Sequence, residues 1–203
     1  MYWKIASLVM FAIFGAWTLY ESRYRARKMQ EKEDAFWERE LEADSVRRKP
    51  IDGLKYVKIP DDLPVDLMQD EPEMESILAT IDGLRKDKIL NLTGYSNTDL
   101  KFEYGAPNLT VLSRYDGNYT TFITTLQKWA DLLLEKGYEA EAVSLMEYIV
   151  ETGGDIGKTY RLLTRHYIDC GEPSKIDGLL QKAEEMRSLN KPYIIASVKD
   201  MMG

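Results

Sequence analysis

The chain has 203 residues, with 27 Lys and Arg against 34 Asp and Glu, which gives a formal net charge of −7. Residues 1–50 hold 10 cations against 8 acids, whereas residues 51–203 hold 17 against 26. An acidic soluble part repels phosphate backbones, which argues against nucleic acid as a partner. The single cysteine, Cys170, excludes an intrachain disulfide.

An uncharged run covers residues 5–20, close to the N-terminus. As a helix its sixteen residues extend about 24 Å, slightly less than the ~30 Å hydrocarbon core of a bilayer. Aromatic residues suited to the headgroup boundary stand at both ends, namely Tyr2, Trp3, Trp17 and Tyr20. We therefore expect residues 1–21 to be a transmembrane anchor that contacts the bilayer through residues 3–20. A cleaved secretory signal and a buried core helix are the alternatives.

The charges that flank this run predict its orientation. Lys4 precedes the run, and five cations follow it, namely Arg23, Arg25, Arg27, Lys28 and Lys32. Cationic flanks stay on the cytoplasmic side, so we expect a single-pass protein of the cell membrane with a cytoplasmic C-terminal domain. The N-x-T triplets at Asn91, Asn108 and Asn118 point to the opposite side, and we interpret them as chance occurrences.

Three segments follow the anchor. Residues 22–49 are dense in both charge signs and predict a helical stalk, because their large apolar residues are too sparse to favour a coiled coil. Residues 50–71 contain three prolines, Pro72 follows directly, and this composition predicts an extended linker. Residues 72–203 predict a helical domain. It begins with an amphipathic helix after Pro72, and the stretch from about residue 93 to 118 is irregular or short-helical.

From Tyr119 onward, apolar residues recur at helical spacing in four stretches, and glycines punctuate them. Short Gly-marked turns between helices imply antiparallel neighbours. A last apolar segment near residue 193 predicts a helix that caps the end of the array. The four stripes contain Phe122, Leu126, Trp129, Ala130, Leu133 and Leu134; Ala142, Leu145, Met146, Ile149 and Val150; Leu162, Leu163 and Tyr167; and Ile176, Leu179, Leu180 and Ala183.

These stripes repeat at an interval of 34 residues. The first copy reads Leu126-x2-Trp129-Ala130-x2-Leu133, then Ala142-x3-Met146, and the second reads Tyr160-x2-Leu163-Thr164-x2-Tyr167, then Ile176-x3-Leu180. This pattern resembles the tetratricopeptide repeat (TPR), a helix–turn–helix unit of that period. Neither copy ends in the proline of that family, and only the first has its small residue on the second helix. The alternative is a helical bundle without repeats.

The resemblance implies an all-α fold: a TPR-like array of α-α hairpins behind the single N-terminal transmembrane helix. We expect two clear repeats, at about 122–155 and 156–189, with capping helices around them. Whether residues 72–118 form a further repeat stays open. The residues expected to pack the repeats are Trp129, Ala130, Leu133, Gly137, Ala142, Met146, Leu163, Tyr167, Gly171 and Leu180.

A cationic face is the candidate binding site. Lys158, Arg161 and Arg165 are spaced i, i+3 and i+7, so they share one face of the first helix of the second repeat. Gln127 and Asp131 occupy the matching face of the first repeat. In tetratricopeptide proteins this helix lines a concave groove, so the resemblance implies a seat for a protein or an acidic peptide. The alternative is an ordinary solvated face.

Motifs for chemistry are weak. Residues 151–160 (ETGGDIGKTY) resemble a phosphate loop. However, only three residues separate Gly153 from Gly157-Lys158-Thr159, where the loop requires four, and a helix rather than a strand precedes it. Asp155 is instead expected to cap the following helix. His166 and Cys170 share a helical face, yet neither a third group nor oxyanion donors can be identified from the sequence. We therefore expect no enzyme, no cofactor, no metal and no small-molecule substrate.

The sequence thus favours a membrane-anchored adaptor that binds a protein partner through a helical groove. A structural or assembly subunit of a larger membrane complex is the first alternative, and an exported helical protein is less favoured. An enzyme would require a pocket that gathers His166, Cys170 and acidic residues.

Overall fold

The computed structural model describes residues 2–203, and it describes all their side chains except those of residues 2, 4–9, 11 and 12. The described residues form eight α-helices and one short 3₁₀ helix. They contain no β-strand, only an isolated antiparallel bridge between Val57 and Ile89. The prediction of an all-α fold is therefore confirmed.

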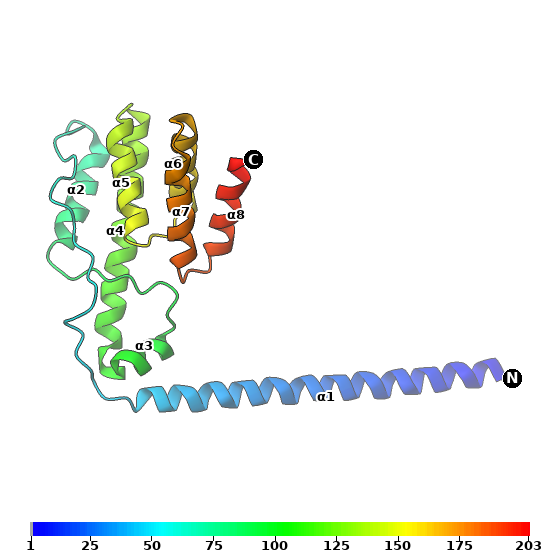
Figure 1. Cartoon of the computed structure of the whole chain (residues 1–203). Coiled ribbons are helices and arrows are strands. Elements are labelled where there is room, and N and C mark those ends of the chain that lie inside the picture. Colours follow the sequence, from blue (N-terminus) through cyan, green and yellow to red (C-terminus); the bar gives the residue numbers. More distant parts are fainter. Residues whose placement is uncertain (1) are drawn as a thin grey trace.

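The first helix, α1 (Tyr2–Asp44), is 43 residues long and projects away from the rest of the chain (Figure 1). The segments expected to be anchor and stalk thus belong to one continuous helix, and no Gly or Pro occurs between Gly15 and Pro50. Within the part of the chain that the structure describes, no helix combines the length and apolar character needed to cross a bilayer. Within the expected span, the side chains of residues 4–9, 11 and 12 lie outside the described residues.

The segment between the linker and the first repeat is more ordered than the sequence indicated. It contains α2 (Pro72–Leu84), α3 (Asn97–Tyr104), the 3₁₀ helix η1 (Ala106–Asn108) and the start of α4 (Leu109–Glu135). A capping box between Ser96 and Asp99 begins α3. The α2 helix packs on α4, whereas α3 packs on α1 and on the start of α4. The two helices lie far apart along α4, so they do not form a further antiparallel pair (Figure 1).

The helices after α4 follow one another at a constant interval. Both α5 (Glu139–Glu151) and α7 (Pro173–Glu185) have 13 residues, and their ends are offset by 34 positions. The same offset separates the end of α4 from that of α6 (Gly157–Asp169). It also separates the start of α6 from that of α8 (Lys191–Met202). The segment expected to be a cap, α8, therefore begins at the position where the first helix of a third repeat would begin.

Equivalent turns join the helices of each pair. Gly137 and Gly171 both have positive φ, at 86° and 69°. The amide of Gly137 donates to Leu134 O at 3.2 Å, and that of Gly171 donates to Ile168 O at 3.1 Å. This geometry satisfies the last carbonyls of a helix and favours glycine, which has no Cβ to clash with the backbone. The same local solution thus occurs twice, 34 residues apart.

We expect these two glycines to respond alike to substitution. Gly137→Ala and Gly171→Ala should each lower the free energy of unfolding by about 1–2 kcal/mol, because an L side chain is disfavoured in the left-handed region. Gly178→Ala is the control, since Gly178 lies inside α7 with open space around it. That change should stabilise the chain by roughly 0.5–1 kcal/mol. Urea unfolding followed by circular dichroism measures all three, and unequal losses at the two turns would argue against their equivalence.

Positions paired by the 34-residue offset have the same burial. Leu126, Tyr160 and Ile194 are all at most 1% exposed, as are Ala130, Thr164 and Val198. Among the residues expected to pack the repeats, those on helix faces are buried apart from the half-buried Leu180, while the turn residues Gly137 and Gly171 are exposed. Leucines 90, 92, 100 and 112 and Tyr115 form a second, smaller core beside α3 and the start of α4.

Residues 50–71 lie on the helical domain as a strap. The amide of Val57 donates to Ile89 O at 2.9 Å, and the hydroxyl of Tyr148 on α5 donates to Lys58 O. Further along, Arg85 donates to Pro60 O at 3.0 Å. The side chain of Leu63 is only 7% exposed. The strap is therefore held along its length by α2, α5 and the segment before α4.

Candidate protein-binding face

The candidate site is the outward side of α4, α6 and α8, which we call the first-helix face. Two side-chain contacts join α4 to α6: Lys158 Nζ lies 2.8 Å from Asp131 Oδ2, and the Thr159 hydroxyl donates to Gln127 Oε1. The α6 helix packs on α8, where Arg161 Nη1 lies 3.4 Å from the Tyr193 hydroxyl. The residues named from the sequence thus lie on neighbouring helices.

Contrary to the expectation, the side chain of Gln127 is not on the exposed surface of the first-helix face. Its side chain is 7% exposed and is held between Thr159 and Asp131, whose Oδ1 accepts from Gln127 Nε2 at 2.9 Å. Thr159 is fully buried. Gln127 therefore satisfies a buried hydroxyl and orients Asp131, because an unpaired polar group at this depth would be unfavourable. A bound partner would not reach its amide.

The three cations of α6 have different environments. Lys158 forms an ion pair with Asp131, although half of its side chain remains exposed. Arg161 reaches the hydroxyl of Tyr193. Arg165 is exposed and has no hydrogen-bond or ion-pair partner among the described residues. Exposed ion pairs contribute little to stability, so Lys158 can leave Asp131 and bind an anion of a partner at small cost. Arg165 would break no existing contact on binding an anion.

Charge is segregated between first and second helices. The α5 helix carries four glutamates and no cation, whereas α6 carries three cations and one aspartate. The α8 helix adds Lys199, which stands 34 residues after Arg165. Lys199 was not predicted, although one further 34-residue step from Arg165 leads to it; Tyr193 pairs instead with the buried Thr159, so the interval gives no signal for it. The first-helix face is thus the more basic side of an acidic chain.

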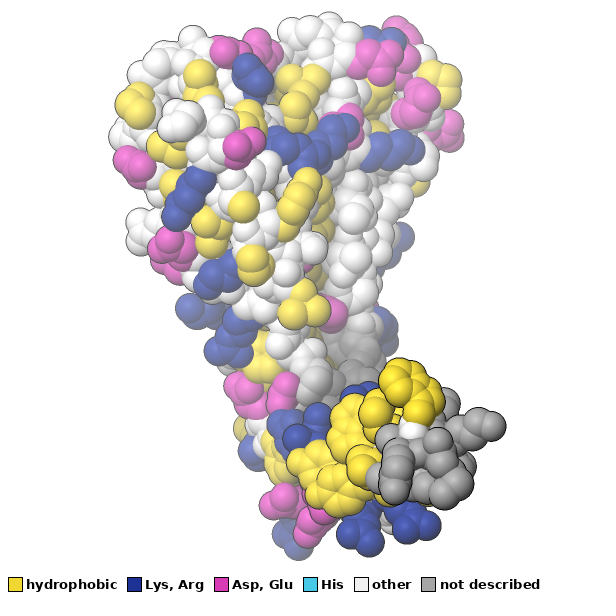
Figure 2. All heavy atoms as spheres, turned by 90° about the vertical axis from the view of Figure 1, so that its right-hand side faces the viewer, with side chains coloured by type: hydrophobic (Ala, Val, Ile, Leu, Met, Phe, Trp, Pro, Cys, Tyr) yellow, Lys and Arg dark blue, Asp and Glu magenta, His cyan; other side chains and the backbone are white. Residues whose placement is uncertain are grey.

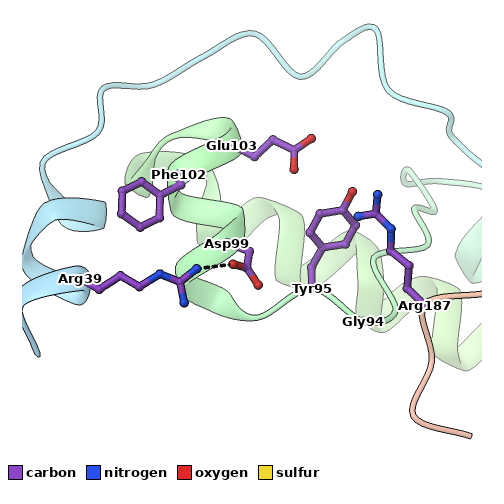
Figure 3. Close-up of a pocket in the computed structure, with 7 residues that line it drawn as sticks. All are labelled: Arg39, Gly94, Tyr95, Asp99, Phe102, Glu103 and Arg187. Atoms are coloured by element: carbon purple, nitrogen blue, oxygen red, sulfur yellow. Dashed lines mark hydrogen bonds and ion pairs between the residues drawn. The ribbon is translucent and has the colours of Figure 1, made fainter. Parts of the chain in front are cut away.

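A separate hollow of about 560 Å³ lies where α1 and α3 approach the α7–α8 connection (Figure 3). Arg39 Nη2 binds Asp99 Oδ1 at 2.7 Å on one side of it. On the other side, the Arg187 guanidinium lies 4.6 Å from the centre of the Tyr95 ring. Gly94 approaches the Arg187 backbone so closely that a Cβ would meet its carbonyl oxygen at 2.5 Å. No sequence motif indicated this hollow.

The phosphate-loop resemblance has a structural explanation. Lys158 pairs with Asp131 and the Thr159 hydroxyl donates to Gln127, so both side chains are engaged across α4 and α6. Asp155 does not cap α6, which contradicts the expectation. Its Oδ2 accepts from the Ser188 hydroxyl, and from Asn190 Nδ2 at 3.2 Å, because the α5–α6 and α7–α8 turns lie side by side.

His166 and Cys170 have a neighbour that the sequence did not reveal. Glu139, at the start of α5, places Oε1 2.9 Å from His166 Nδ1, and Cys170 Sγ lies 3.7 Å from His166 Nε2. The thiol is exposed at the end of α6. The apolar hollow nearby is lined by Tyr167, Ile168, Gly171, Pro173, Ile176, Met201 and Met202, not by the three polar residues. Among the described residues, no group of acids, His and Cys is arranged to hold a metal ion.

The asparagines of the N-x-T triplets all donate to backbone carbonyls. Asn108 is fully buried, and its Nδ2 lies 2.7 Å from both Lys49 O and Tyr104 O. Asn91 Nδ2 donates to Thr152 O at 3.0 Å, and Asn118 Nδ2 donates to Lys88 O at 2.9 Å. A glycan on Asn108 would require this part of the fold to open.

Comparison with known proteins assigns no family: no protein-family model matches the chain, and no curated protein or solved structure does so significantly. The candidate face is therefore defined by its own geometry and charge.

Proposed function

We propose that this protein is a membrane-anchored adaptor whose helical array, of the TPR-like kind, holds a protein or peptide partner on the first-helix face. One observation carries the proposal: α4–α5, α6–α7 and α8 recur at a 34-residue interval with matching burial and matching glycine turns. Stacked helix pairs of this kind create extended concave surfaces that suit polypeptide ligands. The exposed cations of α6 and α8 give this surface affinity for an acidic segment.

The N-terminal part of α1 supports the membrane half of the proposal. Met10, Ile13, Phe14 and Leu19 are 60–72% exposed on different sides of the helix, and hydrophobic side chains are visible on its projecting part (Figure 2). A helix that is apolar all round is stable where apolar surroundings cover every side. We propose that a bilayer covers residues 3–20 and that the basic residues after them keep the array in the cytoplasm.

Charge reversal tests the binding half. Arg161→Glu with Arg165→Glu should reduce the yield of partner recovered with the full chain at least tenfold, because two attractive contacts become repulsive. The midpoint of thermal unfolding should stay unchanged, since neither side chain is buried. The matched control is Glu141→Lys with Glu151→Lys on α5, which should leave the recovery unchanged. Equal recovery from all variants would remove the first-helix face as the binding site.

One observation favours a second candidate, an assembly subunit of a larger membrane complex. Apolar side chains border the hollow at the end of the array, where Met201 and Met202 of α8 meet Pro173 and Ile176 of α7. Such a surface suits a permanent subunit contact. In that case Met201→Glu, rather than the α6 substitutions, would release the chain from its complex.

A further inference from the structure

Residues 50–71 connect α1 to the helical array formed by α4 to α8. However, this segment is not the sole attachment of α1. The last turns of α1 pack directly on α3, which lies more than fifty residues further along the sequence. We call this contact the α1–α3 joint; it consists of Arg39, Glu40, Ala43 and Asp44 with α3.

Side chains on both helices hold the joint. Lys101 of α3 binds Glu40, and also Asp44 at 2.7 Å, while Thr98 donates to Glu40 Oε2 at 2.5 Å. The hydrogen bonds from Lys101 and Thr98 keep the pKa of Glu40 below its ordinary value. Ala43 is fully buried between the helices. Residues 39, 40, 43 and 44 lie on one side of α1, so two successive turns of that side are held against α3.

The chain after α1 reinforces the joint with main-chain contacts. The amide of Ala106 donates to Val46 O at 3.2 Å, and the amide of Lys49 donates to Tyr104 O at 3.0 Å. Arg48 Nε donates to Asn108 Oδ1 at 2.9 Å. Gly105, with φ of 91°, approaches so closely that a Cβ would lie 2.2 Å from Arg47 O. These bonds fix the first residues after α1 to the end of α3.

The helix itself is a stiff spacer. Residues 21–44 contain no Gly or Pro and extend about 36 Å at 1.5 Å per residue. The array grows from α2 towards α8 in the direction in which α1 runs towards its N-terminus (Figure 1). With the N-terminal part of α1 in a bilayer, α8 is therefore the array helix on the bilayer side.

We propose that α1 and the array form one rigid unit, which holds the first-helix face at a fixed height and a fixed orientation relative to the bilayer. This inference rests on the proposed membrane anchor, and it narrows the partner class. A receptor held rigidly away from the lipid accepts a segment that stands away from the membrane, such as the extramembranous domain of a neighbouring membrane protein. A segment lying flat on the headgroups would not reach it.

Pulsed electron spin resonance on the full chain in lipid nanodiscs tests the rigidity. In a Cys170→Ser background, one spin-label pair joins Ser22→Cys on α1 to Ser144→Cys on α5. A second pair, Ser144→Cys with Lys199→Cys, lies within the array. We expect one narrow distance distribution for the first pair, no broader than that of the second. A first-pair distribution more than twice as broad would overturn the proposal.

Two substitutions link the rigidity to the joint. Lys101→Ala removes both ion pairs, and Gly105→Ala prevents the close backbone approach; each should broaden the first distribution at least twofold and leave the second unchanged. Lys128→Ala, on an exposed face of α4, is the matched control and should change neither. Unchanged widths in both joint variants would overturn the assignment to these contacts. The result is independent of partner recovery, so failure of the rigid unit and failure of the adaptor proposal are distinguishable.

Discussion

Replacing Trp129 with alanine is expected to lower the free energy of unfolding by about 3–5 kcal/mol. Trp129 is fully buried in the main core, together with Phe122, Leu126 and Leu133 of the same helix. Removing the indole leaves a cavity that the surrounding helices cannot close, because interiors are close-packed. Its Nε1 has no hydrogen-bond partner among the described residues, so the loss is one of packing rather than of a polar contact.

Chemical denaturation of the full chain, followed by circular dichroism, measures this effect. Lys128→Ala is the control: it lies next to Trp129 in sequence, but its side chain is exposed. That change should stay within about 0.5 kcal/mol of the unchanged chain. A loss below about 1 kcal/mol for Trp129→Ala would mean that α4 is not packed as described.

Placing two aspartates in the middle of the expected anchor should release the chain from membranes. Ile13 and Phe14 lie near the centre of residues 3–20 and are about 60% exposed. Each aspartate at the centre of a bilayer-spanning helix costs roughly 2.5–3.5 kcal/mol. Ile13→Asp with Phe14→Asp should therefore move most of the protein from the membrane pellet to the soluble fraction.

The same helix offers a matched control. Phe36 and Trp37 are exposed to a similar degree, at 54% and 56%, but they lie on the part of α1 that the proposal places outside the bilayer. Phe36→Asp with Trp37→Asp should leave the protein in the pellet after alkaline carbonate extraction. Equal behaviour of the two double variants would contradict the anchor.

Local signals explain how far the fold could be predicted. The 34-residue interval was visible because Gly137 and Gly171 end helices in the same left-handed turn, and because large apolar residues recur between them. The capping box at Ser96 and Asp99 was also present in the sequence, yet the surrounding Tyr, Thr, Asn and Gly obscured α3. Tertiary packing of Leu112, Tyr115 and Tyr119 extends α4 towards the N-terminus, and single-residue propensities do not report such packing.

The candidate site likewise has some features that the sequence predicts and others that depend on contacts between distant residues. The three cations of α6 share a face because their spacing determines it, so the sequence was sufficient to group them. The burial of Gln127 depends on Thr159 of another helix, and the partner of His166 is Glu139, 27 residues earlier. The α1–α3 joint depends on pairs such as Glu40 with Lys101, 61 residues apart. Contacts of this range have no periodic signature in the sequence.

Site-specific photo-cross-linking in intact cells tests most directly whether a partner occupies the first-helix face. A benzophenone amino acid replaces Arg165 on α6 in one version of the full chain and Ser144, exposed on α5, in the other. We predict a discrete covalent adduct from position 165 that position 144 does not give. Adducts from position 144 alone, or equal adducts from both positions, would contradict the account.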